Sequence, residues 1–220
     1  METLTKTWHP LEMLWIILAP LAVALTCIFG GDCSIQSLTS CICGIIFVVL
    51  CAKGKWYAFL FGIIHCFIYG MIAYEQTLYG DAILKFGYSI PMHICGLFLW
   101  YRNTSRRTME VIHRNLDGWG KFLIVFIIGC ATYLLGNVLA LLGDKLPYID
   151  AFTTVASIHG AYLMVTRRAE QWSLFIIINI VSIYMWLMRY MDTGDNLGTL
   201  VMWVIWTINS VYGWFKWNKT

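Results

Sequence analysis

Long apolar blocks, separated by short polar or charged stretches, run through the whole chain. An α-helix needs about twenty apolar residues to cross the hydrocarbon layer of a bilayer, and these blocks approach that length. Eight of them can be counted, at about 11–29, 35–51, 56–74, 83–100, 122–142, 149–166, 172–190 and 197–215. The sixth and seventh are the least regular, because His159 and Asn179 interrupt them. The pattern predicts an all-α integral membrane protein with about eight transmembrane helices.

The composition agrees with a membrane location. Hydrophobic residues make up 60% of the 220 residues and charged residues only 12%, which is about half the charged share of a soluble domain. The first block also has features of a signal peptide, because Lys6 precedes it and small residues occur around Ala22. Glu12 and the length of the apolar run favour a helix that is retained instead.

The lysine and arginine side chains predict the orientation. If both termini lie on the same side of eight spans, that side holds 12 of the 15 Lys and Arg residues. The opposite side holds only Lys85, Lys145 and Arg189. Since cationic loops are retained in the cytoplasm, we expect both termini there. The net charge of +3 is explained by this orientation, and nothing in it indicates nucleic-acid binding.

An internal repeat relates the second quarter of the chain to the last. The matching pairs are Gly44 with Gly160 and Trp56 with Trp172, 116 residues apart, and Gly96 with Gly213 and Trp100 with Trp217, 117 residues apart. Repeats of this kind are typical of transporters, with the substrate site between them. We therefore expect an N-terminal tail and extra helix (1–34), a three-helix unit (35–103), a basic loop with a linker helix (104–150), and a second three-helix unit with the C-terminal tail (151–220). This 3+1+3 order gives the two units the same orientation in the membrane.

Candidate ligand contacts lie in the last two blocks. Asn179 and Trp186 are seven residues apart and so share a helix face, and Trp203, Trp206 and Asn209 form a W-x-x-W-x-x-N run near mid-span. A buried Asn is costly unless another helix or a ligand bonds it. Indole rings stack on flat rings and attract cations. These residues predict a site for a neutral or cationic ring that bears a sugar, and not for an anionic phosphate.

The first unit carries smaller residues opposite these aromatics, in the 116-residue register. His93 stands opposite Asn209 there, which makes it the best ligand candidate among the intramembrane histidines. For His65 and His159 a hydrogen bond between helices is the simpler interpretation. The asymmetry between the units suits a flat, asymmetric ligand.

Backbone breakers interrupt the fourth block, where Gly87, Pro91 and Gly96 occur within ten residues. Proline removes a helical hydrogen bond and kinks the helix. We expect Gly87 and Pro91 to form a hinge or gate beside the substrate path. A packing irregularity, common in membrane helices, is the open alternative.

Other chemistry has little support in the sequence. The carboxylates of Glu75, Asp81, Asp144, Asp150, Asp192 and Asp195 all lie at predicted helix ends or in loops. Coupling to protons or sodium usually needs a carboxylate within the membrane, and ATP hydrolysis needs a phosphate-binding loop. The eight cysteines lie mostly inside the blocks and lack zinc-ligand spacing. We expect a protein that is not an enzyme and that has no metal, cofactor or coupling ion.

Most of the eleven tryptophans lie near the ends of the predicted spans. Indole rings favour the interface between lipid and water, where they form an aromatic belt. This interpretation fits Trp8, Trp15, Trp56, Trp100, Trp172, Trp214 and Trp217. Trp203 and Trp206 fit it less well, because they lie near the middle of their block.

The motifs resemble those of the PnuC family over nearly the whole chain after the first block. They are the run Leu78-Tyr79-Gly80-Asp81, the Gly96/Trp100 ending and the aromatic and Asn pattern of the last two blocks. The resemblance implies duplicated three-helix bundles similar to those of SWEET sugar transporters. It also implies a homotrimer in the bacterial inner membrane that carries nicotinamide riboside by facilitated diffusion, with a cytosolic kinase trapping the substrate.

By position, the family's aromatic and amide contacts correspond to Asn179, Trp186, Trp203, Trp206 and Asn209. Gln76, Tyr79 and Tyr184 are further candidates. Thiamine, riboflavin or a sugar are alternative substrates, since close relatives of the family carry the first two. A membrane receptor or scaffold that binds a ligand without moving it is the alternative outside the transporter class.

Overall fold

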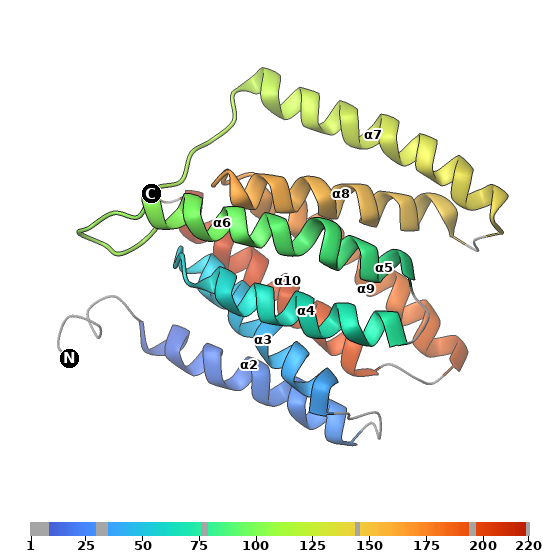
Figure 1. Cartoon of the computed structure of the whole chain (residues 1–220), viewed down its shortest axis with the longest axis horizontal. Helices are drawn as coiled ribbons and strands as arrows, with labels where there is room; N and C mark the ends of the chain where they lie inside the picture. Colours follow the sequence, from blue (N-terminus) through green and yellow to red (C-terminus); the bar gives the residue numbers. More distant parts are fainter. Residues whose placement is uncertain (1–8, 30–34, 76–78, 144–145, 194–196, 219–220) are drawn as a thin grey trace.

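The computed structural model describes residues 9–29, 35–75, 79–143, 146–193 and 197–218 (Figure 1). Apart from turns and one long loop, these residues are helical. The helices are α2 (Pro10–Phe29), α3 (Ile35–Ala52), α4 (Ala58–Glu75), α5 (Tyr79–Leu84), the π-helix η1 (Lys85–Ser89), α6 (Ile90–Arg102), α7 (Gly118–Leu141), α8 (Pro147–Val165), α9 (Gln171–Thr193) and α10 (Leu197–Asn218). The predicted all-α class is confirmed.

Each predicted apolar block coincides with one helix, the fourth block being the continuous rod α5–η1–α6. Among the described residues, three stretches are long and apolar enough to cross a membrane: Ala82–Arg102, Gly118–Leu141 and Gln171–Met188. Shorter apolar stretches lie in α2, α3 and α4. These helices agree with a membrane protein, while the number of eight spans stays a prediction.

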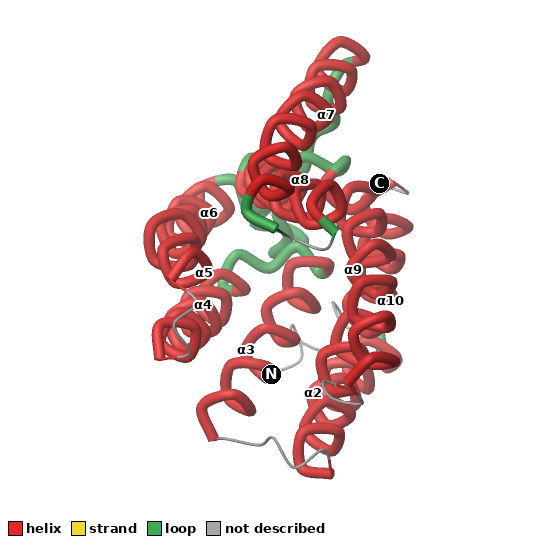
Figure 2. The backbone as a smooth tube through the Cα atoms, turned by 90° about the vertical axis from the view of Figure 1, so that its right-hand side faces the viewer, coloured by secondary structure: helices red, strands yellow, loops and turns green. Residues whose placement is uncertain are grey.

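The helices form a bundle that consists of two sets of three, and the third helix of each set packs against the first helix of the other set. The first set is α3, α4 and α6, and the second set is α8, α9 and α10. Within each set neighbouring helices pack together, and across the sets α6 packs on α8 while α10 packs on α3. Helix α2 packs on α3 and α10. Helix α7 contacts mainly α8 and lies along the outside of the bundle (Figures 1 and 2).

The contacts of two glycines relate the sets to each other and correct the predicted register. A Cβ on Gly96 would lie 2.4 Å from the ring of Phe59, and a Cβ on Gly213 would lie 2.6 Å from the ring of Trp172. Phe59, and not Trp56, therefore occupies the place of Trp172. Equivalent residues of the two sets are therefore 113 residues apart in this region, and not 116. The same separation relates the ends of α3 and α8 and the starts of α4 and α9, which the equally long turns 53–57 and 166–170 connect.

Three of the tryptophans assigned to an interfacial belt are buried instead. Trp100, Trp172 and Trp217 are 0%, 3% and 4% exposed. The indole of Trp217 lies 5.7 Å from that of Trp100 and 5.6 Å from that of Trp172 between ring centroids. Trp100 Nε1 donates to the carbonyl oxygen of Met164 and Trp217 Nε1 donates to that of Ala52. Because each donor bonds the backbone of the opposite set, these indoles join the two sets, and the belt prediction was wrong for them.

Candidate functional site

Trp203 and Trp206 lie on α10 where the two sets meet. Three residues apart on a helix, they are neighbours on its surface, and their rings touch edge to face at 5.0 Å between centroids. Trp203 packs against the buried cluster that contains Val155 and Ile178 of the second set. Trp206 packs against the cluster that contains Ile45 of α3. The pair therefore links the interiors of both sets.

Both indole N–H groups are buried without an acceptor. Neither Trp203 Nε1 nor Trp206 Nε1 has a hydrogen-bond partner in the described part of the chain. Nearly all buried donors in proteins are bonded to protein or to water. Two donors without acceptors on neighbouring rings are typical of a binding site in which a polar ligand or water accepts these hydrogen bonds.

Asn209 lies one turn further along α10 and is only 1% exposed. Its Nδ2 donates to the carbonyl oxygen of Val48 in α3 at 2.8 Å, whereas its Oδ1 is buried with no donor among the described residues. The predicted need for a partner is thus met by another helix for the amide nitrogen only. The oxygen is available to a ligand that offers a hydroxyl or an amide N–H.

Asn179 of α9 is 3% exposed and bonds Ser210 of α10, with 3.1 Å between Nδ2 and Oγ. The bond fixes the orientation of the Asn179 amide. Ser210 is itself 5% exposed, and it was not among the predicted site residues. The sequence feature that could have indicated it is its position directly after Asn209 on a predicted ligand-binding helix.

His93 of α6 is a buried polar residue of the first set, 8% exposed. Its Nδ1 lies 2.7 Å from the carbonyl oxygen of Ser89 and 3.7 Å from Sγ of Cys66. A carbonyl only accepts, so Nδ1 carries the proton in the neutral ring and Nε2 is the acceptor. Nε2 is buried without a partner in the described residues. The ring also packs edge-on against Phe47, with 4.8 Å between centroids.

The contact of His93 with Cys66 corresponds to that of Ser210 with Asn179. Cys66 and Asn179 are 113 residues apart, as Phe59 and Trp172 are. His93 and Ser210 are 117 residues apart, as Gly96 and Gly213 are. His93 therefore stands in the register of Ser210, and the predicted register with Asn209 was wrong by one residue. One set presents a thiol and an imidazole where the other presents an amide and a hydroxyl.

The remaining predicted contacts lie apart from this group or outside the described side chains. Tyr184 is half exposed on α9, and Trp186 is partly exposed two turns beyond Asn179. Gln76 lies outside the described residues. Tyr79 begins α5, and its side chain is not described.

At Gly87 the α-helical hydrogen bonding gives way to the π-helix η1, which ends directly before Ile90. Pro91 lies one residue further along the same continuous helix, where its missing N–H removes one helical hydrogen bond. A Cβ on Gly70 would lie 2.9 Å from the ring of Phe86, so this helix turn packs closely on α4. From the same turn, Tyr88 Oη donates to the carbonyl oxygen of Ile158 at 2.6 Å. The α-helical hydrogen-bond pattern is thus interrupted while the helix continues, and the use of Gly87 and Pro91 as a hinge stays a prediction.

A second polar residue was missed at the start of α9. Gln171 is 0% exposed, and neither its Nε2 nor its Oε1 has a partner in the described residues. The indole N–H of Trp172 beside it has none either. At the border of an apolar block, a glutamine gives no sequence signal that separates a buried site from a polar helix end.

Two cavities lie near the periphery of the bundle. One of about 310 Å³ lies between α3 and α4, beside Thr39 and Phe67. The other, of about 470 Å³, lies between η1, α7 and α8, beside Tyr88 and His159. The tryptophan and asparagine group lines neither of them. Within the described residues, no group of three or more His, Cys, Asp and Glu side chains could hold a metal ion.

Comparison with known proteins places these features in a family. Residues 34–219 match the family described as nicotinamide mononucleotide transporter. The chain is 31% identical over 219 residues to the nicotinamide riboside transporter PnuC of Neisseria mucosa, covering 96% of this chain and 82% of the relative. The protein of the same name from Haemophilus influenzae is 30% identical over 216 residues, covering 96% and 91%.

A solved structure agrees over almost the full length. The crystal structure of the vitamin B3 transporter PnuC matches with a TM-score of 0.81 at 31% identity, over 96% of this chain and 92% of that chain. This chain belongs to the PnuC family. Membership confirms the resemblance seen in the motifs, and it makes the chain a bacterial membrane transporter and not an enzyme.

Proposed function

We propose that this protein carries nicotinamide riboside into the cytoplasm by facilitated diffusion. The curated PnuC relatives named above are nicotinamide riboside transporters, and the chain matches them along most of its length. Within the chain, the proposed site is the group of Trp203, Trp206, Asn209 and Asn179 at the meeting of the two helix sets, with His93 at the corresponding level of the first set.

The observation that carries this proposal is the set of buried polar atoms without partners. The two indole N–H groups of Trp203 and Trp206 are donors, whereas Asn209 Oδ1 and His93 Nε2 are acceptors. Nicotinamide riboside offers ribose hydroxyls and a carboxamide, which both donate and accept. Its pyridinium ring is flat and cationic, so indole faces attract it by stacking and by cation–π interaction.

Nicotinamide mononucleotide is the second candidate, because the matched family description names it. The mononucleotide adds a phosphate, which requires Arg, Lys or a cluster of backbone N–H donors when it is buried. The residues of the proposed site are neutral, and the lysines of the described chain that are buried, Lys53 and Lys55, lie beyond α3 at the end of the bundle. The riboside therefore fits this site better.

We further propose that transport is uncoupled, that both termini lie in the cytoplasm of a bacterium with the chain in its inner membrane, and that a cytosolic kinase traps the product. The excess of Lys and Arg on one side supports the orientation. The homotrimer implied by the family resemblance is part of the same proposal. The 3+1+3 repeat is supported by the matching contacts of Gly96 and Gly213.

Calorimetric titration of the purified protein tests the substrate. Nicotinamide riboside, nicotinamide mononucleotide, thiamine and riboflavin are titrated separately under identical conditions. We expect the riboside to bind at least about tenfold more tightly than the mononucleotide, because burying an uncompensated phosphate costs more than about 1.4 kcal/mol. Equal or tighter binding of the mononucleotide would replace the riboside by the second candidate, and tighter binding of thiamine or riboflavin would assign another vitamin.

A further inference from the structure

The loop between α6 and α7, residues 103–117, crosses one end of the bundle and is called the strap here (Figure 1). At this end α3 and α8 finish, α4 and α9 begin, and α10 ends at Asn218, just after Lys216 and Trp217. The strap therefore passes the ends of both helix sets.

Backbone hydrogen bonds join the strap to both sets at equivalent positions. The N–H of Val111 donates to the carbonyl oxygen of Gly54 at 2.8 Å, and the N–H of Arg114 donates to that of Arg167 at 2.9 Å. Gly54 and Arg167 occupy the same place in their turns, each with positive φ, at 76° and 63°. Both close the C-terminal turn of a helix, as left-handed residues commonly do. One segment thus pairs with the turn of each set.

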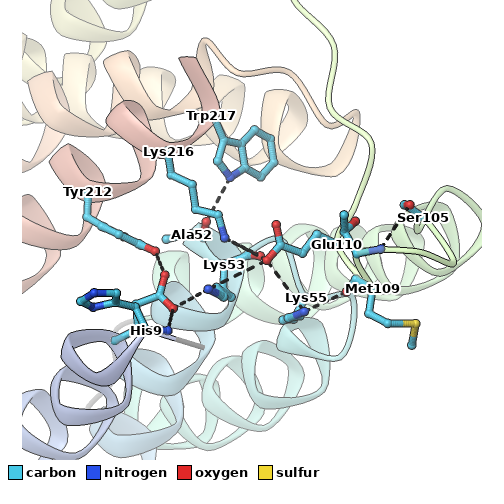
Figure 3. A network of polar contacts seen from close by, with 12 residues as sticks. His9, Ala52, Lys53, Lys55, Ser105, Met109, Glu110, Tyr212, Lys216 and Trp217 are labelled. Atoms are coloured by element: carbon cyan, nitrogen blue, oxygen red, sulfur yellow. Dashed lines mark hydrogen bonds and ion pairs between the residues drawn. The ribbon is translucent and has the colours of Figure 1, made fainter. Parts of the chain in front are cut away.

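Glu110 of the strap lies among three lysines that come from both sets (Figure 3). Its Oε1 is 3.1 Å from Nζ of Lys216 at the end of α10, 3.9 Å from that of Lys55 and 4.0 Å from that of Lys53. Lys55 Nζ also donates to the carbonyl oxygen of Met109 at 3.0 Å. The Glu110 carboxylate is a counter-ion that the ends of the two sets share.

The extra helix α2 joins the same network. Glu12 accepts from Lys53 Nζ and from the hydroxyl of Tyr212 in α10. Burial lowers the pKa of Lys55, whereas the nearby Glu110 carboxylate raises it. Two carboxylates, Glu12 and Glu110, thus face the ammonium groups of three lysines. Removal of Glu110 would leave the cations of the two sets to repel each other across the gap that the strap covers.

A buried apolar layer adjoins this network, since Ala52, Val111 and Trp217 are the chain neighbours of Lys53, Glu110 and Lys216. Trp100, Trp172 and Trp217 form it together with Cys51, which is 2% exposed, and with Val111 of the strap. A substrate held between the helix sets has to pass this layer to reach the strap. Opening would separate Trp100 and Trp217 from their acceptors on the opposite set.

We propose that Glu110 is the latch of the cytoplasmic exit, where it holds the two helix sets together until substrate release moves it away from Lys216. The inference rests on the proposed function, which places this end of the bundle in the cytoplasm. It assigns to the strap a positioning role in the opening step, and no contact with the substrate.

The experiment measures how fast a charged, membrane-impermeant thiol reagent modifies Cys51. The other seven of the eight cysteines are replaced. The reagent is applied to reconstituted vesicles on the side of the membrane that carries the strap and most of the Lys and Arg residues. Glu110→Gln is expected to raise the modification rate about fivefold, because loss of a partly buried ion pair shifts the population toward the open exit by that order. Lys216→Gln, which removes the cation of the second set, is expected to act in the same direction.

Lys121→Gln is the matched control. Lys121 Nζ of α7 pairs with Glu170 at this end, at 3.2 Å, and its replacement leaves Glu170 in place, where it accepts from the N–H of Leu116 in the strap. The modification rate of this variant is expected to equal that of the parent. Equal rates for Glu110→Gln, Lys216→Gln and the parent, with unfolding temperatures unchanged, would overturn the latch, as would an equal rise in Lys121→Gln. Since the measurement uses no riboside, its outcome is independent of the substrate assignment.

Discussion

Asn179 donates a hydrogen bond to the Ser210 hydroxyl in the place where Cys66 meets His93 in the other helix set. The two contacts connect the second helix of each set with its third helix at the same level. A repeated scaffold therefore presents different chemistry from its two halves. An amide and a hydroxyl on one side and an imidazole on the other suit a ligand whose two ends differ, as the carboxamide and the ribose of nicotinamide riboside do.

Replacement of Trp203 or Trp206 by Ala should weaken riboside binding. Each change removes one ring that can stack on the pyridinium, and the expected loss is about 1–2 kcal/mol, roughly five- to thirtyfold in Kd. Phe should recover part of the affinity, because it keeps a ring with a weaker quadrupole. Trp119→Ala is the control, since Trp119 is 69% exposed on α7. If calorimetric titration finds the parental affinity for the riboside in both site variants, these rings serve packing and do not contact the ligand.

The orientation of Asn179 should depend on Ser210. Ser210→Ala removes the acceptor of Asn179 Nδ2, so the amide can turn and the Kd for the riboside should rise about three- to tenfold. Ser210→Thr keeps a hydroxyl and should retain most of the affinity. Asn179→Leu and Asn209→Leu remove amide groups and should bind the riboside more weakly than Ser210→Ala, while both still fold. If Ser210→Ala and Ser210→Thr bind equally well, the hydrogen bond has no role in recognition.

Gly96 and Gly213 should tolerate no side chain. An alanine Cβ would enter the ring of Phe59 or of Trp172, and overpacking of this kind costs about 1–3 kcal/mol. Thermal unfolding in detergent should therefore show a lower Tm for Gly96→Ala and for Gly213→Ala. Gly129→Ala on α7 is the control, because its Cβ would meet no atom within 4 Å. Similar Tm values for all three variants would contradict the ring contacts.

Much of the fold could be predicted from the sequence, because hydrophobic blocks and helix breaks are local signals. The helices follow the blocks, and the interruption of α-helical hydrogen bonding at Gly87 follows the local residue types. The register of the repeat could not be fixed, since Trp56 and Trp172 match in type and not in place. Only the packing of Phe59 on Gly96 reveals the true counterpart.

The candidate site was predicted only in part for a similar reason. Mid-span Trp203, Trp206 and Asn209 are unusual in an apolar helix, and the structure finds orphaned polar atoms on all three. Ser210 and Gln171 were not predicted, because the sequence does not show whether a serine or a glutamine is buried or which side chains surround it. The same holds for the buried Trp100 and Trp217, whose position near helix ends resembles that of lipid-facing residues.

Transport should be independent of ion gradients. A coupled carrier needs an ion site whose occupancy differs between its states. The carboxylates of Glu12, Glu110 and Glu170 form ion pairs with lysines at the strap end of the bundle. Imposed proton or sodium gradients should leave the final distribution of riboside in liposomes unchanged. Accumulation above the outside concentration, without any enzyme inside, would show that coupling exists.

Equilibration of labelled nicotinamide riboside in proteoliposomes that contain only this protein measures the proposed transport directly. We expect protein-dependent uptake that stops when the inside and outside concentrations are equal, and that is strongly reduced when Trp203 and Trp206 are both replaced by Ala. Riboside that binds the purified protein with no uptake above empty liposomes would contradict the proposed transport and would indicate a receptor.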